Sequence, residues 1–400
     1  MQSVLSQLVL GYRPLWGPTR TLAGVELSVH AADAALAVDA PHLLRTLHEL
    51  WAAHSPPLLL APQTRQLLCD LLAHAPPGSP AVAVPGAWLG DSAICQQVQA
   101  AHARGLQLVW RGDAGQPPEP ALARCFDTRL LGLSPETAVR ALQAGAAAGT
   151  LLAGQMVEGL ASRALVALCL DRGQAQAVLG WPQEDVLHSL RHQPLQPARA
   201  TVQKLMKAID AEQSLEVFED ILGEDPLLAY RFMVYTNSAA LGLRTGIDSL
   251  RRGLVMMGYG SLSRWLSDQL PHASAEPDLQ PVRAAMVVRA RLTERLIDAG
   301  LETALRREVY LCALFSQLGE LLREPLGSVL RRVPLSERIY DAAVLQTGPY
   351  APSLAMARAL EGGDAGVVRQ LGKAHGLALE DVNRALLRTL ASLEAAPPAP

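Results

Sequence analysis

Residues 225–270, DPLLAYRFMVYTNSAALGLRTGIDSLRRGLVMMGYGSLSRWLSDQL, decide the fold of the second half of the chain. Apolar residues recur there at helical spacing in three bursts, within residues 228–232, 250–257 and 262–270. Each burst lays an apolar stripe along one face of a helix. The stretch therefore predicts three packed helices.

Short signals mark the expected ends of these helices. Asp225 is placed to cap the first helix, and Pro226 suits its first turn because the amide hydrogen that proline lacks would have no partner there. Asn237 stands where a left-handed helix end is expected, since asparagine tolerates that backbone conformation. Thr245, followed by Asp248, is a weaker capping-box signal for the start of the next helix.

The run DPLLAYRFMVYTNSA, the glycine at position 242 and the segment 247–258 ending in MMG closely resemble the HDOD domain, an all-helical relative of the HD phosphohydrolases. The resemblance extends over about residues 195–395. Its motif positions are expected to shape the helix turns or to contact a partner, and none is expected to be catalytic. They are Asp225, Pro226, Asn237, Ser238, Gly242 and Gly258.

The first half of the chain alternates short apolar runs with helical patterns, which predicts an α/β barrel. No helix separates the first two runs, so a hairpin with a turn at residues 18–22 is expected there. The eight expected strands are Leu8 to Tyr12, Gly24 to Val29, Pro57 to Leu60, Ala81 to Val84, Leu106 to Trp110, Cys125 to Leu130, Thr150 to Ala153 and Val178 to Trp181.

This half resembles the barrel of EAL-HDOD proteins. The segments RPL at residues 13–15 and GVEL at residues 24–27 look like the openings of that family, which puts Glu26 at the position of the family-naming glutamate. Val157-Glu158 resembles a later segment with a second acidic residue. The resemblance implies a degenerate TIM-like EAL barrel over residues 1–183, a linker over 184–197, an all-α HDOD domain over 198–395 and a disordered tail over 396–400.

Composition narrows the class of protein. Half of the 400 residues are apolar and the net charge is −3, so a large core is expected and a nucleic-acid partner is not. Five scattered cysteines with no CxxC pair indicate reduced thiols. With no export signal and no long uncharged apolar run, we expect a cytoplasmic protein without a membrane span.

The ligands of an EAL phosphodiesterase are missing. Such an enzyme hydrolyses cyclic di-GMP with two divalent ions, which need several oxygen ligands, and with a lysine near the attacking water. Residues 1–200 contain no lysine and no asparagine. Arg111 stands where the family has acidic residues, and its charge would repel a metal ion. Glu26 and Glu158 alone cannot hold two ions.

The ligands of an HD phosphohydrolase are missing as well. That chemistry needs at least two histidines and an adjacent His-Asp pair to hold its metal ions. After residue 200 the chain has only His272 and His375, and no His-Asp pair occurs anywhere. Ser316 and Gln317 stand where the pair would fall. No catalytic, metal-binding or cofactor-binding residue is therefore expected.

Two features of the second half suggest binding. Arg244, Arg251, Arg252 and Arg264 lie within about twenty residues, and they form either a solvated helix face or a contact for an acidic partner or a nucleotide phosphate. The aromatic and methionine side chains around them, Met256 among them, belong either to the core or to an adaptable partner groove.

These patterns lead to one hypothesis and two alternatives. The main hypothesis is an inactive adaptor in bacterial signal transduction that acts through protein contacts of its HDOD domain, in a cyclic di-GMP or related circuit. The first alternative is a receptor that binds cyclic di-GMP in the barrel without cleaving it, through Glu26, Glu158 and nearby arginines. The second is a slow phosphodiesterase.

Overall fold

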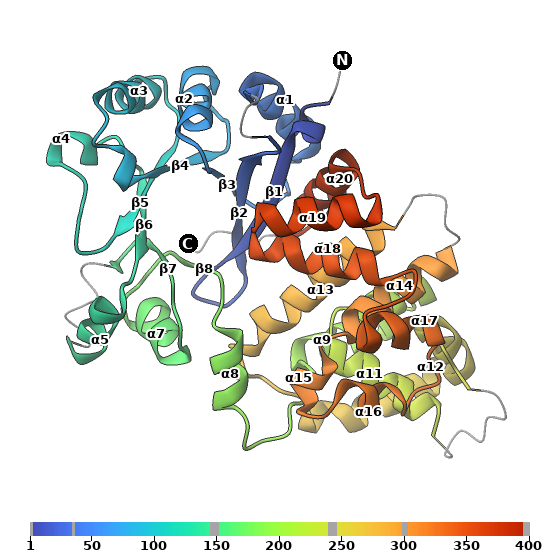
Figure 1. The fold of residues 1–400 in the computed structure, drawn as a ribbon. Helices are drawn as coiled ribbons and strands as arrows, with labels where there is room; N and C mark the ends of the chain where they lie inside the picture. Colours follow the sequence, from blue (N-terminus) through green and yellow to red (C-terminus); the bar gives the residue numbers. More distant parts are fainter. Residues whose placement is uncertain (1–2, 34–36, 145–151, 239–245, 298–302, 395–400) are drawn as a thin grey trace. The chain divides into compact units, whose positions relative to one another are not determined.

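The structure, a computed structural model, describes residues 3–33, 37–144, 152–238, 246–297 and 303–394. The chain forms two compact units (Figure 1). Residues 1–185 and 358–400 make up the first, and residues 186–357 make up the second.

Eight strands in the described part of the first unit close into a barrel in sequence order. The first strand is antiparallel to both of its neighbours, and the other pairs are parallel. The expected α/β barrel with an opening hairpin is confirmed. The strands are β1 (Leu8–Trp16), β2 (Leu22–Ala31), β3 (Leu58–Pro62), β4 (Ala81–Pro85), β5 (Leu108–Asp113), β6 (Thr128–Gly132), β7 (Met156–Glu158) and β8 (Ala177–Leu179).

The seventh strand is not where the sequence pattern placed it. The pattern predicted Thr150 to Ala153, of which the first two residues lie outside the described part, whereas the strand is Met156–Glu158. Gly154 has φ 69° and lies in a turn, so the extended chain begins only after it. The sixth strand likewise starts later than predicted, because Cys125 lies in a turn.

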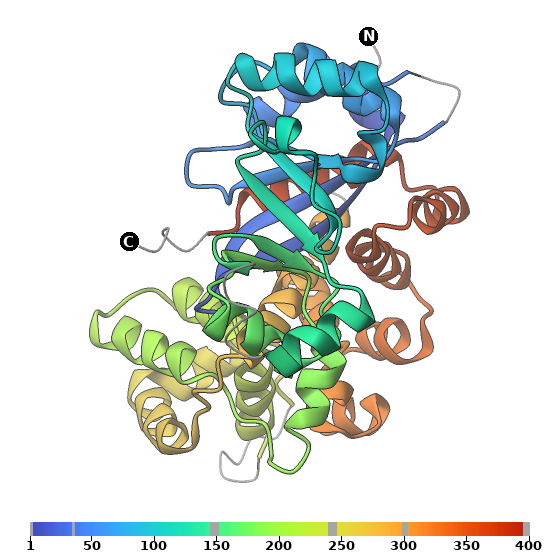
Figure 2. The ribbon, with the colours of Figure 1, turned by 90° about the vertical axis from the view of Figure 1, so that its left-hand side faces the viewer.

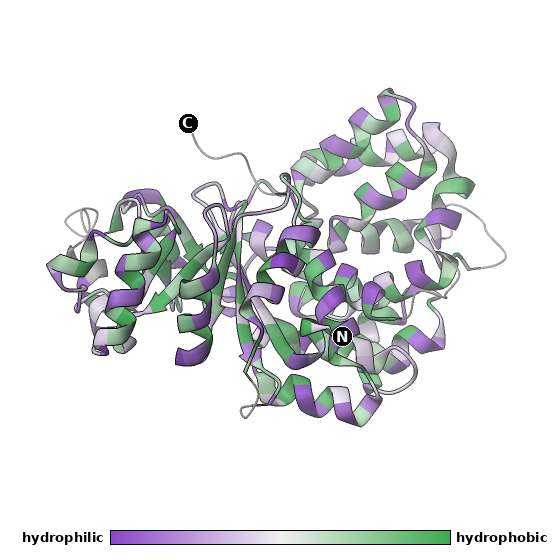
Figure 3. Cartoon of the chain, turned by 90° about the horizontal axis from the view of Figure 1, so that it is seen from above, coloured by the Kyte–Doolittle hydropathy of each residue, from purple (hydrophilic) through white to green (hydrophobic). Residues whose placement is uncertain are grey.

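Helices flank the barrel, which Figure 2 shows from a second side. The strands are largely apolar, and the helices alternate polar and apolar faces (Figure 3). One apolar cluster, with Leu15, Val109 and Met156, contains side chains from all of the strands except β2. The helical elements among the described residues before position 186 are η1 (Val4–Gln7), α1 (Ala40–Leu50), α2 (Arg65–His74), η2 (Gly86–Trp88), α3 (Ser92–Ala103), α4 (Pro120–Ala123), α5 (Pro135–Ala144), α7 (Arg163–Ala167), η4 (Leu168–Arg172) and the start of α8 (Gln183–Ser189).

The last helices of the chain pack with the barrel, although the sequence resemblance extended the helical domain to residue 395. These are the end of α18 (Ala351–Gly362), α19 (Ala365–His375) and α20 (Leu379–Ala391). The fully buried Asn383 side chain donates to the carbonyls of Leu5 and Leu8, both at 2.8 Å, and accepts from the Leu10 amide at 3.2 Å. These bonds satisfy backbone groups that a buried strand end would otherwise leave unpaired.

Close backbone contact also holds this C-terminal segment on β1. A Cβ atom added to Gly11 would lie 2.7 Å from the Cα of Gly363, so only glycine leaves room for the turn between α18 and α19. Arg369 of α19 donates to the carbonyl of Ala32 at 3.2 Å. The segment therefore sits beside the ends of β1 and β2.

The second unit is helical in its described residues, and α8, in the expected linker, leads into it. The predicted packing of helices over residues 225–270 is confirmed as α11 and α12. The elements are α9 (Arg199–Asp210), α10 (Leu215–Gly223), α11 (Pro226–Thr236), α12 (Leu250–Gln269), η6 (Leu270–His272), α13 (Leu279–Leu296), α14 (Thr303–Phe315), α15 (Leu318–Leu322), α16 (Leu326–Leu330), α17 (Glu337–Tyr340), η7 (Asp341–Leu345) and the start of α18. Among the described helices, none has the length and apolar character needed to cross a bilayer.

One helix start differs from the prediction. The capping residue of α12 is Ser249, whose Oγ accepts from the amide of Arg252 at 3.3 Å. Thr245, the predicted cap, lies outside the described residues. Gly258 interrupts α12 with φ 65° and ψ 169°, and this kink separates the second and third predicted helices.

We expect Asn383→Ala to lower the free energy of unfolding by about 2–3 kcal/mol, because three buried backbone groups lose their partner. Chemical denaturation measures this change. Arg384→Ala is the matched control, since Arg384 makes an exposed pair with Glu380 at 2.6 Å, worth only about 0.5 kcal/mol. Equal effects of the two substitutions would contradict the role given to Asn383.

Candidate functional site

Four charged side chains meet inside the barrel. Arg13 lies on β1, Glu26 on β2, Arg111 on β5 and Glu158 at the end of β7. Three of them lie two residues from a member of the interior apolar cluster on the same strand. Side chains two apart on a strand share a face, so the charges lie above that cluster.

The four side chains form a closed ring of alternating charge, which we call the barrel ring. Arg13 Nη2 lies 2.7 Å from Glu26 Oε1 and 3.2 Å from Glu158 Oε2. Arg111 binds Glu158 with two parallel bonds, Nε to Oε1 at 2.8 Å and Nη2 to Oε2 at 2.7 Å. Arg111 Nη1 closes the ring on Glu26 Oε2 at 3.4 Å.

The two glutamates of the barrel ring are largely buried, so their charges need partners within the protein. The side chain of Glu26 is 2 % exposed and that of Glu158 is 15 % exposed, so neither carboxylate is compensated by bulk water alone. Burial works to lower the pKa of the Arg111 guanidinium, but the hydrogen bond to Glu158 and the attraction of Glu26 outweigh it and raise this pKa. Arg111 therefore keeps its positive charge beside the two glutamates.

The barrel ring occupies the oxygens that a metal ion would need. All four carboxylate oxygens of Glu26 and Glu158 already face a guanidinium nitrogen. Among the described residues, no cluster of three or more His, Cys, Asp or Glu side chains could hold a metal ion. The sequence pointed to both glutamates and to the opposing charge of Arg111, but it gave no role to Arg13.

Asp225 joins three helices of the second unit. It is fully buried, and its Oδ1 accepts from the amides of Leu227 and Leu228 at 2.8 and 2.9 Å, which caps α11. Its Oδ2 accepts from the amide of Ala198 at the start of α9, at 2.6 Å, and lies 3.4 Å from Arg283 Nε of α13. Pro226 occupies the first turn of α11. Asp225 therefore sets the packing of this unit and is not exposed to a ligand.

Asn237 has a different role from the one expected. Its backbone has φ −101° and ψ 4°, which is not left-handed. Its side chain instead clamps the chain on both sides of residues 239–245: Nδ2 donates to the carbonyls of Met233 and Ile247, and Oδ1 accepts from the Ile247 amide at 2.7 Å. Ser238 Oγ donates to the carbonyl of Tyr235 at 2.7 Å. Gly242 lies outside the described residues.

The clustered arginines pair mostly with acids of their own chain. Arg251 lies 2.6 Å from Glu216, and Arg252 lies 2.9 Å from Asp248. Arg264 is exposed, and Arg244 lies outside the described residues. The solvated helix face, one of the two interpretations of this cluster, accounts for these contacts.

Three large side chains around the kink of α12 are exposed, and we call them the α12 patch. Val255 is 60 % exposed, Met256 57 % and Tyr259 46 %. The Tyr259 ring packs edge-on against Phe218 at 5.4 Å and its hydroxyl donates to the carbonyl of Gln213, so it is held in place. Neighbouring Met257 and Trp265 are buried. Of the aromatic and methionine side chains in this segment, Met257 and Trp265 thus belong to the core, whereas Met256 is exposed.

The family model of the HDOD domain matches residues 195–325. A curated relative, the cyclic di-GMP phosphodiesterase CdgJ of Vibrio cholerae, is 23 % identical over 169 residues, which are 42 % of this chain and 39 % of CdgJ. The uncharacterised protein YuxH of Bacillus subtilis is 20 % identical over 173 residues, 42 % of each chain. The chain thus spans about two fifths of the length of these two relatives.

Solved structures with some likeness include the MmoQ response regulator of Methylococcus capsulatus, with TM-score 0.40 and 17 % identity over 48 % of this chain and 97 % of that one. The YkuI protein of Bacillus subtilis, which has an EAL domain, gives TM-score 0.32 and 11 % identity over 66 % of this chain and 74 % of that one. These scores are low, so the barrel is assigned from its own strand order.

Removal of one arginine of the barrel ring tests its balance of charge. We expect Arg111→Ala to lower the free energy of unfolding by about 2 kcal/mol, less than for a fully buried pair because Arg111 is partly exposed. The double variant Arg111→Met with Glu158→Gln removes one charge of each sign and should recover at least about half of that loss. Denaturant titration compares the variants, and a double variant no more stable than Arg111→Ala would contradict the ring.

Proposed function

Since residues 195–325 form an HDOD domain, we propose that this chain is a catalytically inactive regulatory adaptor that acts through protein contacts in bacterial signal transduction. The observation that carries the proposal is the barrel ring. Two guanidinium groups stand among the carboxylates that a metal-dependent phosphodiesterase would use.

Electrostatics supports the loss of hydrolysis. A divalent ion placed between Glu26 and Glu158 would have to displace Arg13 and Arg111, which are already paired, and would meet their positive charge. Two-metal hydrolysis needs two such ions and several further oxygen ligands. No lysine or asparagine occurs in residues 1–200 to supply the other family roles.

The α12 patch supports action by contact. Exposed apolar residues cost free energy in water, and clusters of them mark surfaces that bind a partner. The flexible thioether of Met256 suits adaptable packing, while Tyr259 is anchored by its hydroxyl bond to Gln213. The name of the relative CdgJ leads us to place the adaptor in a cyclic di-GMP circuit.

A receptor that binds cyclic di-GMP without cleaving it is the alternative. Its phosphates would need cationic groups in the barrel, and the exposed edge of Arg13, 37 % accessible, is what favours this interpretation. Both arginines of the ring, however, already pair with glutamates. Phosphate binding would therefore require the ring to open.

We expect no hydrolysis of cyclic di-GMP by the purified full chain with Mg²⁺ or Mn²⁺, because the barrel ring leaves no ligands for the ions. Turnover that Glu158→Ala abolishes would establish the residual phosphodiesterase instead. Titration calorimetry with the same dinucleotide tests the receptor: micromolar binding that Glu26→Ala weakens would replace the adaptor with the receptor.

We expect the substitution Met256→Asp to remove at least about nine tenths of the partner protein captured from a bacterial lysate by the full-length chain, because a charge in the α12 patch would be buried on binding. Quantitative mass spectrometry measures the captured proteins. Val367→Asp is the matched control, since Val367 is also exposed, at 42 %, and lies on α19. Equal capture by the two variants would exclude the α12 patch as the contact surface.

A further inference from the structure

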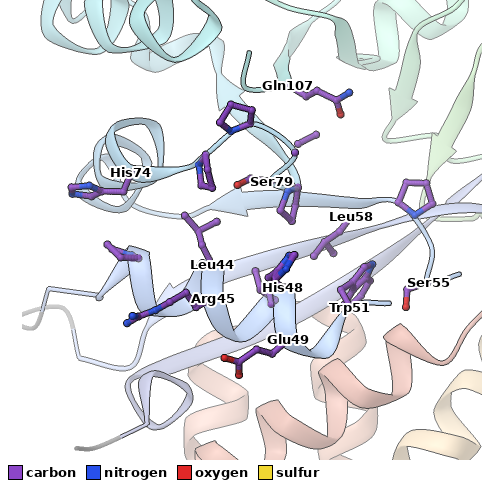
Figure 4. Close-up of a pocket in the computed structure, with 18 of the residues that line it drawn as sticks. Leu44, Arg45, His48, Glu49, Trp51, Ser55, Leu58, His74, Ser79 and Gln107 are labelled. Carbon is purple, nitrogen blue, oxygen red and sulfur yellow. The ribbon is translucent and has the colours of Figure 1, made fainter. Parts of the chain in front are cut away.

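A groove of about 960 Å³ lies at the end of the barrel where β3 and β4 begin. Figure 4 shows His48 of α1 on one side and His74 of α2 on the other. Several prolines and Trp51 also line it, together with charged side chains of both signs, Arg45 and Glu49. Apolar rings and opposite charges together select no single class of ligand, so the groove identifies no ligand by itself.

Glu219 of α10 is a buried acid of the second unit that is held quite differently from Asp225. The residue is 4 % exposed. Arg251 Nη1 of α12 lies 3.9 Å from Glu219 Oε2, and Arg307 Nε of α14 lies 3.9 Å from Glu219 Oε1. Both distances exceed that of a hydrogen bond. Within the described part of the chain, charge attraction is therefore what holds this carboxylate.

Each of these arginines makes its closest contact with another acid of α10. Arg251 Nη2 donates to Glu216 Oε1 at 2.6 Å. Arg307 Nη1 lies 2.8 Å from Asp220 Oδ1. Glu216 and Asp220 are both more than half exposed, whereas the side chain of Glu219 is 5 % exposed. The acid with the least access to water thus has the weaker contacts.

This arrangement favours the protonated form of Glu219, because burial penalises a charge that no hydrogen bond stabilises. Burial raises the pKa of Glu219 against the attraction of Arg307 and Arg251, and repulsion by Asp220 and Glu216 adds to the rise. The hydrogen bond from Arg251 lowers the pKa of Glu216 to about 2. Two acids three residues apart on α10 thus share one arginine and have pKa values shifted in opposite directions.

The contacts of Glu219 adjoin the α12 patch. Arg251 precedes Val255 by about one helical turn, so both lie on the same face of α12. Phe218, the residue before Glu219 on α10, packs edge-on against Tyr259 at 5.4 Å. Helix α10 therefore holds the patch from both ends.

We propose that Glu219 is a proton-sensitive latch between α10 and the α12 patch. The ionised carboxylate attracts Arg251 and Arg307 toward α10. When it takes up a proton this attraction ends, and Arg251 keeps its exposed pair with Glu216, which contributes little. Proton uptake therefore weakens the attachment of the start of α12. As a control of partner binding the latch rests on the proposed role of the α12 patch, whereas the proton site depends only on the surroundings of Glu219.

The test follows the ε-methyl group of Met256 by carbon-13 NMR on the full chain with labelled methionines, between about pH 4 and about pH 8. The chain has eight methionines, and Met256→Leu identifies the signal. We expect this signal to shift in one step with its midpoint above about 4.3, the pKa of a free glutamate. In Glu219→Gln the step should be absent, because the group that takes up the proton is gone.

Glu294→Gln is the matched control. Glu294 of α13 is another half-buried acid whose pKa is raised by burial, and it also acts on Arg307. The Met256 step should remain in this variant. Chemical denaturation at about pH 7.5 verifies that Glu219→Gln is folded, and its midpoint should be at least that of the native chain, since a charge that burial penalises has been removed.

Two results would overturn the latch: a Met256 step that persists in Glu219→Gln, or no step above about pH 4.3 in the native chain. The measurement needs no partner protein. If the step depends on Glu219 while Met256→Asp leaves capture from the lysate unchanged, the proton site stands and the proposed contact through the α12 patch fails.

Discussion

The barrel depends on the balance of four charges in its interior. Two carboxylates that lie almost out of water need positive charge beside them, and a protein can supply it with metal ions or with its own side chains. Here Arg13 and Arg111 supply it, and each guanidinium contacts both glutamates. The chain's own side chains therefore balance these carboxylates, and a divalent ion would have to displace them.

In the second unit, too, a buried carboxylate is stabilised by groups of its own chain. Asp225 is fully buried, and three backbone amides and the guanidinium of Arg283 stabilise its carboxylate. These contacts connect α9, α11 and α13. A charge so fully used by its own chain cannot also hold a ligand. Glu26 and Glu158 in the first unit and Asp225 in the second therefore serve the packing of their own unit.

Much of this could be predicted from the sequence because it depends on neighbours along the chain. Alternation and turn residues predicted the barrel and its opening hairpin, whereas the pairing of Arg13 with Glu26 depends on the register of that hairpin, which the structure gives. Contacts across long separations carried no such signal. Asn383 bonds to residues more than 370 positions away, so the attachment of the last helices to the barrel could not be foreseen. Asn237 misled because a side-chain clamp and a left-handed cap favour the same residue type.

The barrel ring and the groove lie at opposite ends of the barrel. Reaction sites of α/β barrels lie where the parallel strands end, and there the barrel ring and the turn at Gly363 fill the space. The opposite end, where β3 and β4 begin, ordinarily serves stability, yet it carries the open groove of prolines and Trp51. The two ends of the barrel therefore differ in chemistry: one carries the four paired charges of the barrel ring, and the other carries a groove lined by several prolines and Trp51.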